Sequence, residues 1–303
     1  MDRRTSLAAI AALPAVVSTS WASAASFTVI QSLKPSPTMP VLFLGHGSPM
    51  NAIEDNPWRH AWQAMGVEIL KRAEQPQLIL CISAHWLTRG EWQLTGMAKP
   101  KTIHDFGGFP QALFDQQYPA PGAPVVARKL AQELQSPASG GAIGVDPAEW
   151  GFDHGTWSVL KPMFPKADIA VMQLSMDFSR PPPEHYALGQ QLHKLRQRGV
   201  LIIGSGNIVH NLRAVKRDTA ASEAYDWAIA FDNMAQEQIK KGQLDALQNF
   251  QALGDVAKQA HPTYDHYLPL LYAAGAARST EMPRFFNTGF QSASISMRSV
   301  LWG

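Results

Sequence analysis

The chain has 303 residues, of which 46% are apolar and 17% are charged. A chain of this length and composition can bury a full core without disulfides, and its low charge excludes long disorder and an extended coiled coil. Its net charge is +2 without a basic block, so we expect no nucleic acid as a partner. The single cysteine excludes a disulfide framework and a thiolate zinc cluster, so any metal must be held by histidine or carboxylate, and ten histidines are present.

Residues 1–24 have the features of an export signal. Arg3 and Arg4 precede an apolar run from Leu7 to Val17, and small residues at 22–24 are typical of a cleavage site. The run is too short to span a hydrocarbon core of about 30 Å, so we expect no stable membrane insertion. The paired arginines favour the twin-arginine export machinery as a partner and a periplasmic or otherwise exported protein. A cytoplasmic location is the alternative if the signal does not function.

Residues 25–38 are rich in Ser, Thr and Pro and are expected to form a linker, which leaves one domain over residues 39–303. In that domain, short apolar runs alternate with helical patterns. The runs predict strands at Pro40–Leu44, Gln77–Ser83, Asp168–Leu174 and Val200–Ile203, and helices are expected at Pro57–Ala73, Glu184–Gln197, Ala221–Lys241 and Tyr267–Ala274. Arg284–Phe286 and Ser294–Leu301 are expected to be two more strands, paired antiparallel. The sequence therefore predicts an α/β fold with a mixed central sheet flanked by helices.

Three histidines follow predicted strands directly. His46 comes after the first strand, His85 after the second, and His210 just past the strand at Val200–Ile203. Ligands in open α/β sheets bind beyond the carboxyl ends of the strands, so these side chains can converge if the strands are neighbours. Neutral imidazole is a strong ligand for zinc and iron, and this spacing indicates a metal site at that end of the sheet.

The other histidines divide into surface and pocket positions. His60, His185 and His193 lie in polar helical patterns and are expected to face solvent. His154, beside Asp153 and between glycines and aromatics, could carry a proton near neutral pH. The residues 102–109 include His104 and resemble a pocket loop. His261 and His266 both precede a predicted helix, and spacing leaves open which of them is a ligand.

Other chemistries lack their signatures. The sequence has no GxSxG elbow and no P-loop, and Gly204-Ser205-Gly206 lacks the continuation that a dinucleotide site requires. Cys81 lies within an apolar run and is expected to belong to the core.

Six motifs in order closely resemble one family, the 4,5-DOPA extradiol dioxygenase branch of the class III extradiol ring-cleavage dioxygenases. They are Leu44–Met50 (LGHGSPM), Ser83–Trp86 (SAHW), Ile103–Pro110 (IHDFGGFP), Gly151–Gly155 (GFDHG), Ser205–Arg213 (SGNIVHNLR) and Pro262–Pro269 (PTYDHYLP). Together they extend over nearly all of the domain expected at residues 39–303.

The resemblance implies an enzyme that opens the ring of a catechol such as L-DOPA with O₂, at one mononuclear divalent metal. Fe(II) would serve the dioxygenase activity, whereas purified protein could carry Zn(II). The resemblance implies His46, His85, His210 and His266 as metal ligands and His154 as the catalytic acid and base. His104, Asp105, Phe106 and Tyr264 are expected to contact the substrate. Two alternatives remain at this stage: a zinc-dependent hydrolase and a binding protein that keeps the fold without its chemistry.

Overall fold

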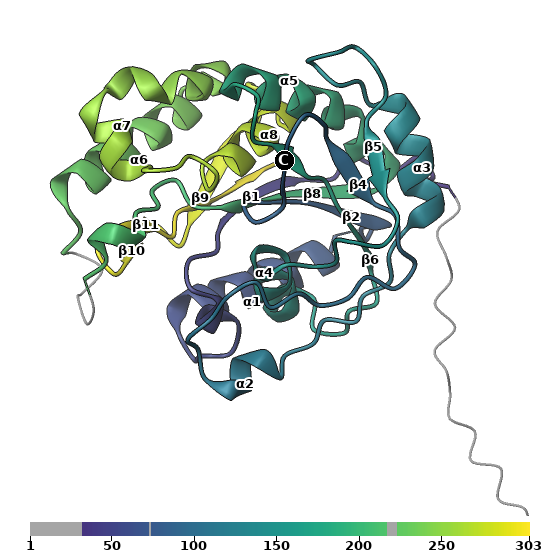
Figure 1. Ribbon diagram of the computed structural model, residues 1–303, viewed down its shortest axis with the longest axis horizontal. Helices are drawn as coiled ribbons and strands as arrows, with labels where there is room; N and C mark the ends of the chain where they lie inside the picture. Colours follow the sequence, from purple (N-terminus) through teal and green to yellow (C-terminus); the bar gives the residue numbers. More distant parts are fainter. Residues whose placement is uncertain (1–31, 73, 217–222) are drawn as a thin grey trace, which may run out of the picture.

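The computed structural model describes residues 32–72, 74–216 and 223–303, and its centre is a six-stranded sheet in the order β6-β2-β8-β1-β12-β9 (Figure 1). Four strands run parallel: β1 (Val41–Gly45), β2 (Leu78–Ser83), β6 (Ala170–Gln173) and β8 (Val200–Gly206). β9 (Pro283–Phe286) and β12 (Ser299–Trp302) complete one edge antiparallel. The mixed sheet expected from the sequence is confirmed.

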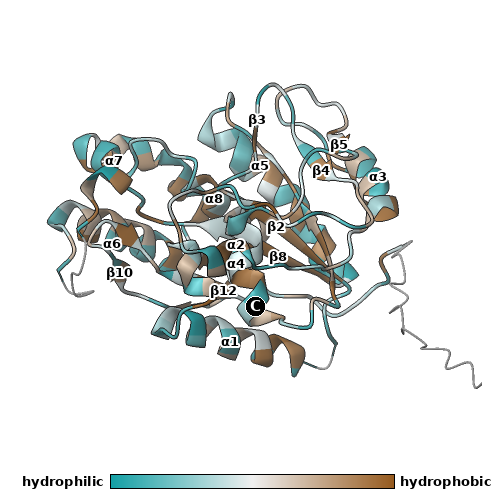
Figure 2. Cartoon of the chain, turned by 60° about the horizontal axis from the view of Figure 1, so that its bottom comes forward, coloured by the Kyte–Doolittle hydropathy of each residue, from teal (hydrophilic) through white to brown (hydrophobic). Residues whose placement is uncertain are grey.

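Helices cover both faces of this sheet, which explains why its parallel strands are continuous apolar runs rather than alternating ones. On one face, Leu42 and Leu44 pack toward α1 (Pro57–Leu70) and α4 (His154–Met163). On the other face, Val41 and Phe43 pack toward α5 (Pro182–Leu192) and α8 (Leu268–Ala276). The strands β2 and β8 are accordingly apolar until their last residues, whereas the surrounding helices carry both polar and apolar residues (Figure 2).

Shorter elements surround the main layers. The remaining strands are β3 (Leu87–Thr88), β4 (Gln93–Thr95), β5 (Gly144–Asp146), β7 (Met176–Asp177), β10 (Phe290–Gln291) and β11 (Ile295–Ser296), which pair as three small sheets. The remaining α-helices are α2 (Gln111–Phe114), α3 (Pro124–Glu133), α6 (Asp226–Lys240) and α7 (Asp255–Ala260). The 3-10 helices are η1 (Pro49–Ala52), η2 (His193–Arg198), η3 (Leu212–Ala214) and η4 (Leu244–Leu253). No helix of the described ranges is long and apolar enough to cross a membrane.

Two predicted elements are divided in the structure. The helix expected at Glu184–Gln197 becomes α5 followed by η2, and Gly199 ends it with a left-handed φ of 70°. The prediction of one strand at Ser294–Leu301 is wrong, because the structure has two separate strands there. The first, β11, pairs with β10, and the second, β12, pairs with β1 and β9, so the chain changes partners between them.

The expectation that His185 faces solvent is also wrong. His185 is fully buried, its Nδ1 lies 2.8 Å from the Tyr272 hydroxyl, and its Nε2 lies 3.2 Å from the Arg180 carbonyl. It precedes the buried Leu188 by three residues and therefore belongs to the face of α5 that packs on α8. The signal expected at residues 1–24 lies outside the described residues.

Candidate metal centre

A cavity of about 490 Å³ lies at the carboxyl ends of β1, β2 and β8. Its lining comes from seven separate segments of the sequence. The residues are His46, Gly47, Ser48, Pro49, His85, Asp105, Phe106, Phe109, His154, His210, Leu212, Val215, His266, Gln291, Ser292 and Ile295. All five histidines that the sequence assigned to the metal or to proton transfer thus lie on one cavity.

Three imidazoles form the compact core of this cavity. The ligand atoms of His46, His85 and His266 all lie within 4.8 Å of one another, and the Nε2 atoms of His46 and His85 are 3.3 Å apart. The backbone sets this convergence, because the His46 N–H donates to the Gly206 carbonyl at 3.0 Å at the end of β8. The His266 carbonyl would lie only 2.2 Å from a Cβ at position 206, so glycine there allows the loop to approach the strand.

Each of these three rings has an oxygen at its other nitrogen. The Nδ1 of His46 lies 3.1 Å from the Ser205 hydroxyl, and the Nδ1 of His85 lies 3.1 Å from an Asp105 carboxylate oxygen. The Nδ1 of His266 contacts the Asp265 carboxylate. Oxygens at Nδ1 fix the tautomer and leave the Nε2 lone pairs free, as ligand histidines require.

Burial keeps two of the rings uncharged. It holds the pKa of His46 and the pKa of His266 well below the usual value, and the neighbouring imidazoles lower both further. Burial also lowers the pKa of His85, but the carboxylates of Asp105 and Asp153 outweigh that effect and leave the pKa raised. Three imidazole nitrogens with these partners match the donor set that zinc and iron accept, so the residues fit a divalent metal.

His210 lies beside the group of three rather than within it. Its ring stacks on the ring of His266 with centroids 3.5 Å apart and an interplanar angle of 5°. The ring nitrogens of two stacked rings lie at the edges of the stack. The group of ligand atoms within 4.8 Å of one another includes His266 but not His210. Burial lowers the pKa of His210 to about 3. The structure therefore brings together three of the four predicted ligands, and a ligand role for His210 stays a prediction.

His154 begins α4 and lies beside His85. Its ring centroid is 3.8 Å from that of His85, and its Nδ1 lies 3.0 Å from Asp105. Burial lowers the pKa of His154, and the nearby His85 lowers it further, so the ring is ready to accept a proton. Asp153 caps α4 by accepting from the Thr156 N–H at 3.1 Å, which places His154 at the first position of the helix.

Asp105 joins the two imidazoles. One carboxylate oxygen lies near His85, and the other accepts from the His154 backbone N–H at 2.8 Å. Burial raises the pKa of Asp105, but His154 and His85 outweigh it and hold that pKa far below the usual value. The sequence suggested Asp153 as the neighbour of His154. Asp153 instead accepts from Ser83, Trp150 and Gln173.

The predicted substrate contacts divide into two pairs. Asp105 and Phe106 line the cavity, and their contact with a substrate stays a prediction. His104 does not, because its Nε2 donates to the Gln116 carbonyl at 2.9 Å. Tyr264 lies on a separate cavity of about 160 Å³ and packs against Phe178, with ring centroids 5.1 Å apart. A substrate contact for His104 or Tyr264 stays a prediction that this placement does not support.

Sequence reasoning missed several residues of the site. Ser205 and Asp265 hold the rings of His46 and His266, and the sequence had assigned no role to either residue. Asp265 directly precedes His266 in the sequence, and this neighbouring carboxylate could have indicated a partner for the imidazole. Leu212 and Val215 carried none, because apolar side chains near a motif look like core.

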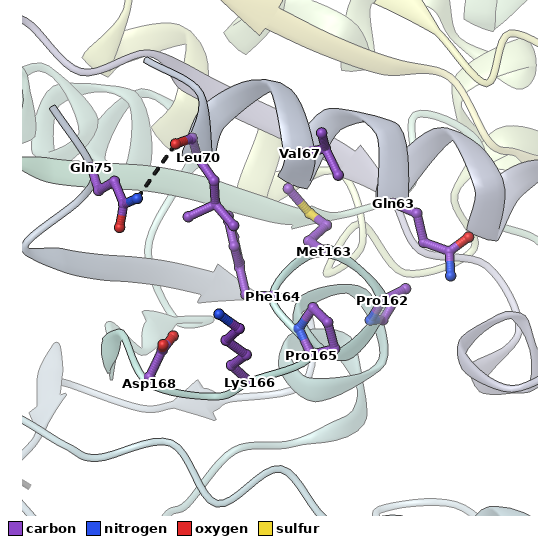
Figure 3. A pocket seen from close by; sticks show the side chains of 10 residues that line it. All are labelled: Gln63, Val67, Leu70, Gln75, Pro162, Met163, Phe164, Pro165, Lys166 and Asp168. Atoms are coloured by element: carbon purple, nitrogen blue, oxygen red, sulfur yellow. Dashed lines mark hydrogen bonds between the residues drawn. The ribbon is translucent and has the colours of Figure 1, made fainter. Parts of the chain in front are cut away.

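A second cavity lies at the other end of the sheet and lacks this chemistry. It has a volume of about 360 Å³, between α1 and the segment that follows α4 (Figure 3). Its lining is Gln63, Val67, Leu70, Gln75, Pro162, Met163, Phe164, Pro165, Lys166 and Asp168. No histidine or cysteine lines it, so the cavity with the imidazoles is the better site for metal chemistry.

Comparisons with known proteins agree with this geometry. Residues 40–299 match the family model described as the catalytic LigB subunit of aromatic ring-opening dioxygenase. The chain is 44% identical over 270 residues to the 4,5-DOPA dioxygenase extradiol of Escherichia coli K12, covering 88% of this chain and 96% of that protein. It is 33% identical over 258 residues to the protein of that name from Beta vulgaris, covering 85% of this chain and 94% of the relative. A crystal structure of an uncharacterized protein from Escherichia coli K12 superposes with a TM-score of 0.72 at 38% identity, covering 88% of this chain and all of that one.

Proposed function

The chain belongs to the LigB family of aromatic ring-opening dioxygenases and is a ring-cleaving enzyme of the 4,5-DOPA extradiol dioxygenase branch, and on that premise we propose that it opens an L-DOPA-like catechol with O₂. One observation carries the proposal: the Nε2-presenting rings of His46, His85 and His266 converge in a cavity large enough for a small aromatic ligand. Four relatives named 4,5-DOPA dioxygenase extradiol support L-DOPA as the reference substrate.

The proposed metal is Fe(II), held by His46, His85 and His266, with His210 as the predicted fourth ligand. When bound, a divalent metal supplies a Lewis acid and one meeting point for the two diol oxygens and O₂. The same nitrogens suit zinc, so a purified sample could contain zinc without using it.

His154 is the proposed carrier of protons. Its Nδ1 faces Asp105 at 3.0 Å, which leaves Nε2 to take a proton from a phenolic hydroxyl and return it as the ring opens. Asp105 orients this ring and that of His85 together, so one carboxylate positions both the proton carrier and a proposed metal ligand. The rings of Phe106 and Phe109, with centroids 5.3 Å apart, form an aromatic wall that packs against the substrate ring and excludes water.

The test is reconstitution with Fe(II) under argon, followed by O₂ with L-DOPA and with simple catechols. We expect uptake of one O₂ for each catechol consumed and a yellow ring-fission product. Protein loaded with zinc should bind catechol but take up no O₂. Absence of O₂ uptake with every catechol, together with ester or amide hydrolysis by the zinc form, would contradict the proposal and favour the hydrolase alternative.

We also propose that the enzyme acts after export through the twin-arginine pathway. The support is the order of Arg3-Arg4, the apolar run from Leu7 to Val17 and the small residues after it. Replacing both arginines with lysine should move the protein from the periplasmic to the cytoplasmic fraction. An unchanged distribution would argue against this route.

A further inference from the structure

Two serines lie side by side at the carboxyl ends of β2 and β8, and both are fully buried. Ser83 ends β2, Ser205 lies one residue before the end of β8, and the parallel register pairs them directly. Cys81 and Ile203, two residues earlier on each strand, belong to the core cluster that includes the apolar residues of α4. Side chains two apart on a strand share a face, so both serines lie on the α4 side of the sheet.

Both hydroxyls hold the first turn of α4. The Ser83 hydroxyl donates to an Asp153 carboxylate oxygen at 2.6 Å. The Ser205 hydroxyl donates to the Gly155 carbonyl at 2.5 Å, and these two acceptors flank His154 at the start of the helix. A Cβ at position 155 would lie only 2.3 Å from the Ser83 hydroxyl oxygen, so glycine allows the turn to approach the strand. The ends of β2 and β8 therefore set where α4 begins.

Each hydroxyl also contacts a proposed metal ligand. The one proton of the Ser205 hydroxyl is donated to α4, so at 3.1 Å this oxygen accepts from the Nδ1–H of His46. That tautomer leaves the lone pair of His46 on Nε2, the nitrogen that lies 3.3 Å from the Nε2 of His85. The proton of the Ser83 hydroxyl is likewise donated to α4, so this oxygen accepts from the backbone N–H of His85 at 3.2 Å. Each serine thus makes one bond to α4 and one to a ligand histidine.

We infer that Ser83 and Ser205 are positioning residues that hold the proton carrier in place relative to the metal ligands. The ring of His154 lies with its centroid 3.8 Å from that of His85 and 5.7 Å from that of His46. The hydroxyl is the essential group, because replacing either serine with alanine breaks the bond to α4 and the bond to the ligand at once. Since the inference uses the proton-transfer role of His154, it rests on the proposed function.

Ser205→Ala in the full-length enzyme is the main test. The Nδ1–H of His46 then lacks its acceptor, so we expect affinity for Co(II), measured against a chelator under argon, to fall by about 10–100-fold. The visible absorption of the Co(II) protein should change as well, because the imidazole is no longer held in one orientation. With Fe(II) at saturation, kcat for catechol should fall by about 10–100-fold, since a misplacement of about 1 Å at an active site can cost that much.

Three further variants separate positioning from a general loosening of the fold. Ser83→Ala should lower kcat as much as Ser205→Ala but Co(II) affinity by less, because Ser83 contacts the backbone of its histidine and not the ring. In a His154→Ala background, Ser205→Ala should still weaken Co(II) binding but lower kcat no further, because the group that it positions is gone. An equal loss of kcat in both backgrounds would contradict the coupling. Ser205→Cys keeps a weak S–H donor, should give smaller changes in the same direction, and carries the test if the alanine variant does not fold.

Ser158→Ala is the matched control. Ser158 is a buried serine of α4 whose hydroxyl has no hydrogen-bond partner among the described residues. This variant should keep the Co(II) affinity, the absorption and the kcat of the parent. If the Ser205 variants keep all three as well, the positioning role is overturned and the proposed function stands. If no form of the enzyme cleaves a catechol, the proposed function fails, and the coupling to His154 fails with it whatever the Co(II) measurements show.

Discussion

The metal cavity and the cavity beside α1 lie at opposite ends of the parallel strands and differ in which residues the loops bring into them. At the carboxyl ends, loops after β1, β2 and β8 place imidazoles around a volume of about 490 Å³. At the amino ends, Gln75 precedes β2 and Asp168 precedes β6 on a cavity of about 360 Å³ with an apolar floor (Figure 3). Volume and apolar lining are shared, so neither identifies the functional end. The functional end is identified instead by the converging imidazole nitrogens, because each of these rings also has an oxygen at its other nitrogen.

The largest effect is expected from His46→Ala. Removing one of three converging nitrogens should lower metal affinity by more than the roughly 10–100-fold that loss of an outer hydrogen-bond partner costs. Metal content after gel filtration and O₂ uptake with catechol measure the two consequences, and both should fall to background. Val67→Ser in the other cavity should leave both at the parent level. Equal metal content in His46→Ala and the parent would refute the ligand assignment.

His154→Ala should separate proton transfer from metal binding. The ring packs beside His85, and its ligand atom groups with those of His85 and Asp105 rather than with those of His46 and His266, so metal content should stay near that of the parent. Turnover should fall by about 10²–10⁴-fold, the usual contribution of a positioned acid or base. Single-turnover O₂ uptake together with metal analysis makes the measurement. Loss of metal along with activity would place His154 among the ligands instead.

The sequence was sufficient for the main parallel strands because these follow from local pattern, whereas the convergence of the histidines was conditional on neighbouring strands, which the order β2-β8-β1 supplies. Apolar runs ending in Gly-His and Ala-His predicted parallel strands whose ends meet, and β1 and β2 confirm them. It could not show how His210 is oriented, because stacking on His266 depends on the angle at which two loops meet. Nor could it select Asp105 over Asp153 as the partner of His154. That choice depends on a segment 49 residues away in the sequence.

Asp105→Asn tests that pairing and should have an intermediate effect. The amide keeps the size of the side chain but removes the negative charge that holds His85 and His154. We expect metal affinity to fall by about 10–100-fold. Competition with a chelator of known affinity measures this without turnover. Asp153→Asn provides the comparison: its carboxylate accepts from Ser83, Trp150 and Gln173 rather than from the imidazoles, so stability should fall more than metal affinity.

His185 extends the comparison to a third place, because it is a buried histidine that lines neither the metal cavity nor the cavity beside α1. Burial lowers its pKa from 6.5 to about 4, although the Arg180 carbonyl and Asp177 oppose the shift. The unfolded chain therefore binds a proton below about pH 6.5 that the folded chain does not bind until about pH 4. His185 thus contributes stability above pH 6.5 that is lost as the pH falls toward 4.

The expected loss from this one group between pH 7 and pH 5 is about 2 kcal/mol in the free energy of unfolding, since one pKa unit corresponds to about 1.4 kcal/mol. His185→Gln removes the titration and keeps a polar group near the Tyr272 hydroxyl, so its unfolding free energy should depend less steeply on pH by that amount. Urea unfolding of both proteins at the two pH values gives the difference. A variant as sensitive to pH as the parent would mean that the fold does not lower the pKa of His185. Burial would then not suffice to keep an imidazole neutral, and the neutrality of His46 and His266 would have to come from their neighbours.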